Sequence, residues 1–188
     1  MTFANTLIGI CWISVILVWF IYSKGGRKSD KQPEPKLRYW IRFLLLGCFI
    51  LCLIIKELRE LNDLHLFSPN YFIQGLGVFI CILGVCFAIR SRIQIGKSWG
   101  LPMSINESPV LVTTGPYRIV RHPIYAGLCL AMLGSMVTAG ALLFFWYFIW
   151  TLYFIYSAVE EEKVMLLQFP NEYPEYKKAT KMMIPFVL

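Results

Sequence analysis

The stretch from Leu111 to Gly127 reads LVTTGPYRIVRHPIYAG and leads from a polar segment into a long apolar run. Gly115-Pro116 predicts a turn, because glycine tolerates positive φ and proline has its φ preset. Pro123 suits the first turn of a helix, where its missing N–H would lack a partner anyway. Arg121 and His122 are therefore expected at a helix N-terminus. There, unpaired N–H groups and the positive end of the helix dipole favour a carboxylate or a phosphate.

The same stretch has a simpler interpretation as the loop by which the chain enters a membrane. Arg118 and Arg121 would then be positive anchors on the cytoplasmic side, and Pro123 would only start the helix. The close succession of Tyr, Arg, His, Pro and Tyr within residues 117–125 favours a functional site over an anchor alone.

The composition is that of a membrane protein. Of the 188 residues, 57% are hydrophobic and the mean hydropathy is +0.60, whereas soluble domains are about 45–50% apolar. The formal charge is +7, but the basic residues fall in short segments between apolar runs, where they would face anionic lipid headgroups. Nucleic acid is therefore not expected as a partner, and residues 1–188 are expected to form one domain.

Cysteine usage gives no sign of a metal site. The six cysteines all lie inside apolar runs, none forms a Cys-x-x-Cys pair, and the chain has only two histidines. A zinc site is not expected. The cysteines are interpreted as small apolar residues.

Five apolar runs predict an all-α fold with five transmembrane helices, since about 20 apolar residues cross a bilayer. The runs cover about residues 2–22, 39–55, 71–89, 123–137 and 141–157. Sixteen of the eighteen Lys and Arg residues fall at one end of these runs. Because cytoplasmic loops are enriched in Lys and Arg, this predicts an outside N-terminus and a cytoplasmic C-terminus. The protein would lie in the cell membrane of a prokaryote or the endoplasmic reticulum of a eukaryote.

Two further segments surround the helical hairpin predicted at 123–157. Residues 93–120 mix apolar and polar groups with several glycines and prolines, which predicts a structured loop that covers a site. Residues 160–181 predict a polar cytoplasmic helix broken near Pro170 and Pro174. This segment begins with three glutamates at the expected end of the preceding helix, where negative charge is unfavourable. They are either a solvated charge run or are compensated by arginine or a cationic ligand.

The polar groups suit S-adenosylmethionine, which carries a carboxylate, an ammonium group, a ribose and an adenine. Tyr117, His122 and Tyr125, together with the helix N-terminus, can bind its carboxylate. Glu161 can take the ammonium or the ribose, and Val110-Leu111-Val112 can supply backbone groups and apolar walls. The soluble alternative is a Rossmann-like sheet, which needs alternating strands and helices, and this sequence does not have that pattern.

From about Gln94 onward the chain resembles the isoprenylcysteine carboxyl methyltransferase family and the related phospholipid methyltransferases. The matching elements are Gly115-Pro116-Tyr117, Arg121-His122-Pro123-Ile124-Tyr125-Ala126-Gly127, Glu161-Glu162, Phe169, Tyr173 and Tyr176. The resemblance implies a cofactor-binding part over about residues 94–188. It implies S-adenosylmethionine binding by Val110, Leu111, Val112, Tyr117, His122, Pro123, Ile124, Tyr125, Glu161 and Glu162. Which of the three glutamates contacts the cofactor stays open.

The expected reaction is methyl transfer to the carboxylate of a lipid-linked, isoprenylcysteine-like acceptor that enters from the membrane. An α-carboxylate with a pKa of about 3.5 is ionised at neutral pH and needs no general base. An aligned, desolvated site favours a displacement in which both charges vanish. Arg121 is expected to hold the acceptor carboxylate, with Glu161 as the second catalytic residue. The eukaryotic carboxyl methyltransferases have Arg just before the Glu cluster, but residues 155–159 here contain none, so a phospholipid amine stays open as the acceptor.

Two other functions stay open. Membrane sterol reductases have a similar Arg-His-Pro-x-Tyr motif and use NADPH, but they usually show Arg-Asp chemistry where this chain has Glu160-Glu161-Glu162. A non-enzymatic membrane subunit would leave the Arg-His-Pro and Glu clusters without a role. The sequence predicts no oligomeric state.

Overall fold

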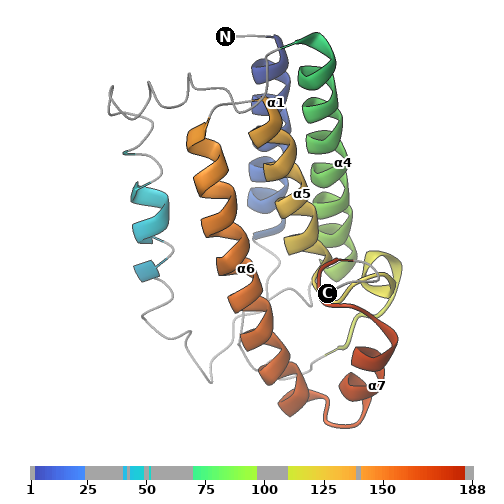
Figure 1. Ribbon diagram of the computed structural model, residues 1–188. Helices are drawn as coiled ribbons and strands as arrows, with labels where there is room; N and C mark the ends of the chain where they lie inside the picture. Colours follow the sequence, from blue (N-terminus) through green and yellow to red (C-terminus); the bar gives the residue numbers. More distant parts are fainter. Residues whose placement is uncertain are drawn as a thin grey trace.

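The computed structural model describes residues 3–23, 40–41, 43–48, 51, 70–96, 110–138 and 141–184. This part of the chain is helical, with one isolated β-bridge between Val120 and Lys181 (Figure 1). The elements are α1 (Phe3–Ser23), α4 (Tyr71–Ile95), the 3₁₀ turn η3 (Gly115–Arg118), α5 (Pro123–Thr138), α6 (Ala141–Gln168) and α7 (Glu172–Ala179). The helix expected at 39–55 is helical at its described residues, 40–41, 43–48 and 51. The rest of that prediction, and residues 97–109 of the expected loop, lie outside the described residues.

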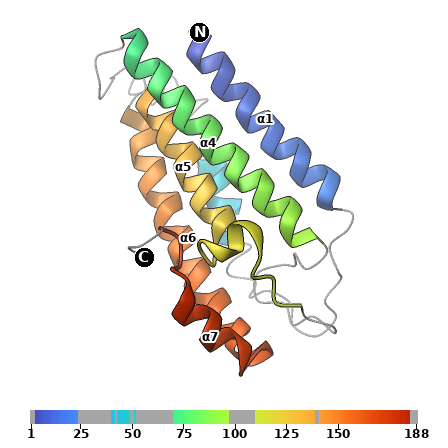
Figure 2. The same ribbon diagram turned by 90° about the vertical axis from the view of Figure 1, so that its right-hand side faces the viewer.

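Three of the described helices are long and apolar enough to cross a membrane: Phe3–Tyr22, Tyr71–Ile95 and Leu143–Gln168. Helix α5 is apolar but only 16 residues long, about 24 Å against a hydrocarbon core of about 30 Å. Large apolar side chains cover the outside of the bundle, as lipid contact requires. The chain is an integral membrane protein. Helix α1 begins at the end of the bundle opposite α7 (Figures 1 and 2). The number of five membrane spans and the sides on which the termini lie stay predictions.

Helices α4 and α6 are longer than the sequence predicted. Helix α6 continues to Gln168, so the three glutamates lie inside a helix and not at its C-terminal end. The predicted end at 157 was wrong because it treated the change to charged residues as a helix end. Glu and Lys are good helix formers, and Glu160 pairs with Lys163 across one turn at 2.6 Å. Helix α4 likewise passes 89 and ends at Ile95, capped by Gly96, whose φ of +50° suits glycine.

Proline decides where α6 stops. The residue before a proline is disfavoured in helical conformation, and α6 ends two residues before Pro170. The break expected there is confirmed. The second break, expected at Pro174, was wrong, because this proline lies in the first turn of α7, where a missing N–H costs nothing.

Helices α4 and α5 pack with their backbones in contact. Gly77 and Gly84 on α4 face Gly127 and Gly134 on α5. A Cβ added at Gly84 would lie 2.3 Å from the Ala131 backbone nitrogen. This close approach confirms the small-xxx-small pattern of α5. It places the start of α5, and therefore His122, against the end of α4.

Helix α1 is attached to this pair by apolar packing and by hydrogen bonds, among them one that Arg92 Nη2 on α4 donates to the Tyr22 carbonyl at 2.8 Å. Val15 joins Cys81, Val85 and Ala131 in a buried cluster. Trp12 Nε1 donates to Ser135 Oγ at 3.0 Å, and Ser135 Oγ donates to the Ala131 carbonyl at 2.9 Å. Figure 2 shows α1 alongside α4, on the side away from α6.

The Trp12–Ser135 bond should contribute modestly to stability. Replacing Trp12 with Phe keeps an aromatic ring but leaves Ser135 without this donor. We expect a loss of about 0.6 kcal/mol, the mean for hydrogen bonds between membrane helices, measured as the thermal unfolding midpoint in detergent. In a Ser135→Ala background, Trp12→Phe should lower the thermal midpoint by less than it does in the wild type. An equal decrease in both backgrounds would show that the Trp12–Ser135 hydrogen bond does not contribute to stability.

Candidate active site

The candidate active site lies where the end of α4, η3, the start of α5, the second half of α6 and the segment after α7 meet (Figure 1). The turn before α5 is built as its sequence predicts. Gly115 has a φ of +63°, and Pro116 and Tyr117 are buried in η3. The Tyr117 hydroxyl donates to the Ser91 carbonyl at 3.5 Å, and Tyr176 Oη donates to the Tyr117 carbonyl at 2.6 Å. Burial raises the pKa of Tyr117 and raises that of Tyr176 to about 12, so both hydroxyls remain neutral donors.

Residues 180–183, here called the C-terminal strap, run beside the Arg-His-Pro segment. Arg121 N donates to the Lys181 carbonyl at 2.8 Å, and His122 N donates to the Met182 carbonyl at 2.9 Å. Two backbone donors near the N-terminus of α5 are thus used by the strap and are not available to an anion. These two bonds to the strap fix the backbone positions of Arg121 and His122, and therefore the points from which their side chains extend.

Arg121 and Glu162 form a buried ion pair. Arg121 Nε lies 2.6 Å from Glu162 Oε1, and the two side chains are 8% and 7% exposed. Lys177 Nζ lies 2.6 Å from the other oxygen, Glu162 Oε2. Arg121 Nη1 also donates to the carbonyls of Lys177, at 3.2 Å, and Thr180. Glu162 therefore connects α6 to the start of α5 and to α7, and arginine compensates this glutamate, as one interpretation of the Glu cluster expected.

Glu161 points to a second group of side chains. Tyr125 Oη donates to Glu161 Oε1, and His122 Nδ1 lies 3.4 Å from Glu161 Oε2. The Tyr125 ring stacks between His122 and Phe154, with centroids 5.8 and 5.0 Å away. A carboxylate beside stacked aromatic faces is a suitable environment for a cationic ligand.

His122 lies between two carboxylates. Its Nε2 is 3.6 Å from Glu162 Oε1 and makes no hydrogen bond with any described residue, although it is buried. Burial opposes a charge on the ring, but Glu161 and Glu162 together outweigh it and raise the pKa of His122 above its ordinary 6.5. His122 is thus buried between two carboxylates that favour its protonated form, and its Nε2 makes no hydrogen bond with the described residues.

The raised pKa of His122 predicts a pH-dependent contribution to stability. A raised folded-state pKa stabilises the fold fully below the unfolded value, and the gain is lost as the pH rises through the folded value. We expect wild type to exceed His122→Gln in thermal midpoint most clearly below pH 6.5, with the difference shrinking at higher pH. Thermal scans between pH 5.5 and 9 would measure it, and an advantage that grows with pH would contradict a charged His122.

The remaining predicted residues lie around this centre. Val110 is exposed, and Leu111 and Val112 are half-buried in the segment without regular secondary structure before η3. Pro123 is buried and Ile124 half-buried at the start of α5. Sequence reasoning missed Lys177, Phe154 and Thr180. No local pattern places Lys177 beside Glu162, because the contact depends on the turn at Pro170, whereas Phe154 lies two helical turns before Glu161 and could have been found once α6 was known to be continuous.

Comparison with known proteins decides the family. The phospholipid methyltransferase family matches residues 72–172, more than half of the chain. The chain belongs to this family. As a phospholipid methyltransferase family member it is a methyltransferase of the membrane, and its matched region contains η3, α5, α6 and both carboxylate groups of the site.

The relatives that this family member resembles include O-methyltransferases of isoprenylcysteine and an S-methyltransferase of methanethiol. The chain is 30% identical to protein-S-isoprenylcysteine O-methyltransferase of Schizosaccharomyces pombe, over 79% of this chain and 67% of that protein. It is 27% identical to protein-S-isoprenylcysteine O-methyltransferase A of Arabidopsis thaliana, over 74% of each. It is 24% identical to methanethiol S-methyltransferase of a Pseudomonas species, over 94% of this chain and 76% of that protein.

Proposed function

We propose that the protein transfers a methyl group from S-adenosylmethionine to the carboxylate of a lipid-linked, isoprenylcysteine-like acceptor. The observation that supports S-adenosylmethionine as the cofactor is the pair formed by Glu161 and His122. It combines a carboxylate beside stacked aromatic rings with a buried imidazole whose Nε2 has no hydrogen-bond partner among the described residues. A ligand with both an ammonium and a carboxylate fits this donor and acceptor set.

The cofactor would be held by groups from three segments. His122 would bind its carboxylate beside the adjoining Pro123-Ile124, and Tyr125, whose hydroxyl donates to Glu161, would hold Glu161 in place for the ammonium or ribose. Residues 110–112 would line the adenine site. Tyr117 would hold the turn that follows them, and Glu162 would hold Arg121. When bound, S-adenosylmethionine supplies an electrophilic methyl group on a sulfonium.

The chain's own residues would orient the acceptor and exclude water. Arg121 is held in place by Glu162, and we propose that this fixed positive charge orients the acceptor carboxylate. Buried side chains from α4, α5 and α6 surround the centre, which favours loss of charge in the transition state. No side chain is required as a base, because the acceptor carboxylate is already ionised.

A thiol acceptor is the second candidate. Residues 155–159 contain no basic side chain, and Ser157 Oγ, buried on α6 one turn before Glu161, has no hydrogen-bond partner among the described residues. The neutral Ser157 hydroxyl suits an acceptor with a small neutral head better than it suits an acceptor with a carboxylate. The Pseudomonas relative, whose name specifies methanethiol, is similar over 94% of this chain.

A phospholipid amine is the third candidate acceptor, because the matching family is described as phospholipid methyltransferase.

The acceptors are separated by one assay. Membranes containing the expressed protein receive methyl-labelled S-adenosylmethionine with N-acetyl-S-farnesylcysteine, methanethiol or phosphatidylethanolamine. We expect label in a base-labile methyl ester with the farnesyl acceptor. Label only in dimethyl sulfide would support the thiol function instead, and label only in the phospholipid would overturn both.

A further inference from the structure

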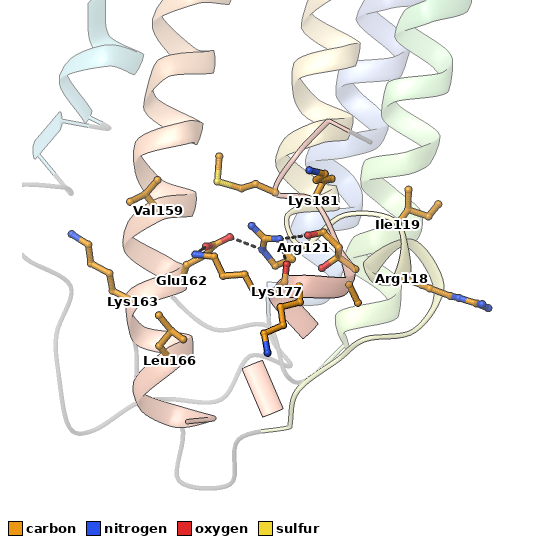
Figure 3. A pocket seen from close by; sticks show the side chains of 13 residues that line it. Arg118, Ile119, Arg121, Val159, Glu162, Lys163, Leu166, Lys177 and Lys181 are labelled. Atoms are coloured by element: carbon orange, nitrogen blue, oxygen red, sulfur yellow. Dashed lines mark hydrogen bonds and ion pairs between the residues drawn. The ribbon is translucent and has the colours of Figure 1, made fainter. Parts of the chain in front are cut away.

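A cavity of about 990 Å³ lies on the other side of the Arg121–Glu162 pair, between α6, α7 and the C-terminal strap (Figure 3). Its walls combine apolar and basic side chains: Ile119, Val159, Leu166 and Met182 with Arg118, Arg121, Lys163, Lys177, Lys178 and Lys181. Glu162 is the one carboxylate among the residues that line it. Arg121, which we assign to the acceptor carboxylate, and Glu162 form one wall of this space, and the assignments above give its other lining residues no role.

The charges leave the cavity positive. Glu162 is shared by Arg121 and Lys177, so this group of three carries a net positive charge. In Figure 3, Arg121 points toward Glu162 across the cavity, whereas the Arg118 side chain points away from it. Lys181 makes no ion pair with the described residues, and its backbone is held by Arg121 N. An anionic head would meet Lys177 and Lys181 from two different segments.

The cavity also continues into an apolar surface. Leu152, Tyr156 and Val159 repeat at helical spacing along α6 and are 66%, 47% and 42% exposed. Val159 belongs both to this stripe and to the cavity wall. The stripe rises about 10 Å from Val159 to Leu152 at 1.5 Å per residue, within the span Leu143–Gln168. A ligand that fits both parts therefore has an anionic head and a hydrocarbon chain.

We propose that this cavity binds the headgroup of an anionic phospholipid, with its phosphate between Lys177 and Lys181 and an acyl chain along the α6 stripe. Basic pockets at the membrane surface commonly bind such headgroups, with about 1 kcal/mol for each nearby Lys or Arg. The bound lipid bridges α6, α7 and the strap, the same elements that hold Arg121 and His122. It therefore stabilises the active-site end of the bundle without taking part in methyl transfer.

The test is native mass spectrometry of the full-length protein in detergent, titrated with dioleoylphosphatidylglycerol. We expect one saturable lipid, and binding about 25-fold weaker in the Lys177→Gln, Lys181→Gln double variant, at about fivefold per lysine. Arg90→Gln, which removes a charge at the exposed end of α4 outside the cavity, should bind within twofold of wild type. Leu166→Trp fills the cavity with all charges kept and should also lose the lipid. This second variant separates lost binding from any effect on Glu162.

Four outcomes would overturn the proposal. Equal weakening in Arg90→Gln would indicate a general charge effect, and dioleoylphosphatidylcholine binding as tightly as the anionic lipid would remove the role of head charge. Glycerol phosphate binding as tightly would assign the cavity to a soluble phosphate. Competitive displacement by N-acetyl-S-farnesylcysteine would assign it to the methyl acceptor.

Discussion

Glu161→Gln should weaken the binding of S-adenosylhomocysteine roughly 100-fold, or about 3 kcal/mol, within the range for a buried charged partner. The amide keeps the shape of the side chain and can still accept from Tyr125, so the loss reports the negative charge. Isothermal titration calorimetry on the detergent-purified protein measures it directly. Binding at wild-type affinity would show that Glu161 is not the cofactor's carboxylate.

Glu160 and Glu162 are the matched controls for this prediction. Glu160 pairs with Lys163 on the exposed side of α6, so Glu160→Gln should leave both affinity and thermal midpoint unchanged. Glu162 is the buried partner of Arg121 and Lys177. Glu162→Gln should lower the thermal midpoint, because removing one member of a buried pair costs about 3–5 kcal/mol. Three adjacent glutamates are thus expected to give three different results.

Gly84→Ala should destabilise the fold by about 3 kcal/mol, at the upper end for overpacking. The added Cβ would lie 2.3 Å from a backbone nitrogen of Ala131 and 2.6 Å from the Gly127 carbonyl oxygen. Backbone atoms in two packed helices cannot move aside singly, so α4 and α5 must separate. The thermal midpoint should fall by about 6–12 °C, at about 2–4 °C for each kcal/mol in a chain of this size.

Gly75→Ala makes the same chemical change on the same helix and is the matched control. Nothing lies within 4 Å of a Cβ at Gly75, and alanine is favoured over glycine in a helix by up to about 1 kcal/mol. Its midpoint should stay the same or rise. Equal losses at both positions would contradict the close packing of α4 and α5.

Local chemistry was sufficient to predict the start of the site. Pro123 begins α5 as expected, and the hairpin of α5 and α6 brings Tyr125 to Glu161. These features depend on a preset φ and on two neighbouring helices, both of which are visible in the sequence. Pairing of a glutamate with an arginine was one of the interpretations left open, and the sequence decided neither which arginine nor which glutamate would take part.

Features that depend on tertiary contacts could not be predicted. The end of α6 was placed too early because a polarity change marks where a helix leaves the apolar layer, not where its hydrogen bonds stop. The strap and Lys177 reach the site through the turn at Pro170 and the bridge between Val120 and Lys181, and no periodic pattern encodes such a return. The backbone contact of Gly84 with α5 needed both helices in place before the glycine could be distinguished from Gly75.

The most direct test of the central claim is calorimetric titration of the wild-type protein with S-adenosylhomocysteine, with NADPH as the comparison ligand. The account predicts micromolar binding of S-adenosylhomocysteine and no binding of NADPH. Binding of NADPH alone, by a protein shown to be folded, would contradict it and make the Arg-His-Pro segment a nucleotide-phosphate site.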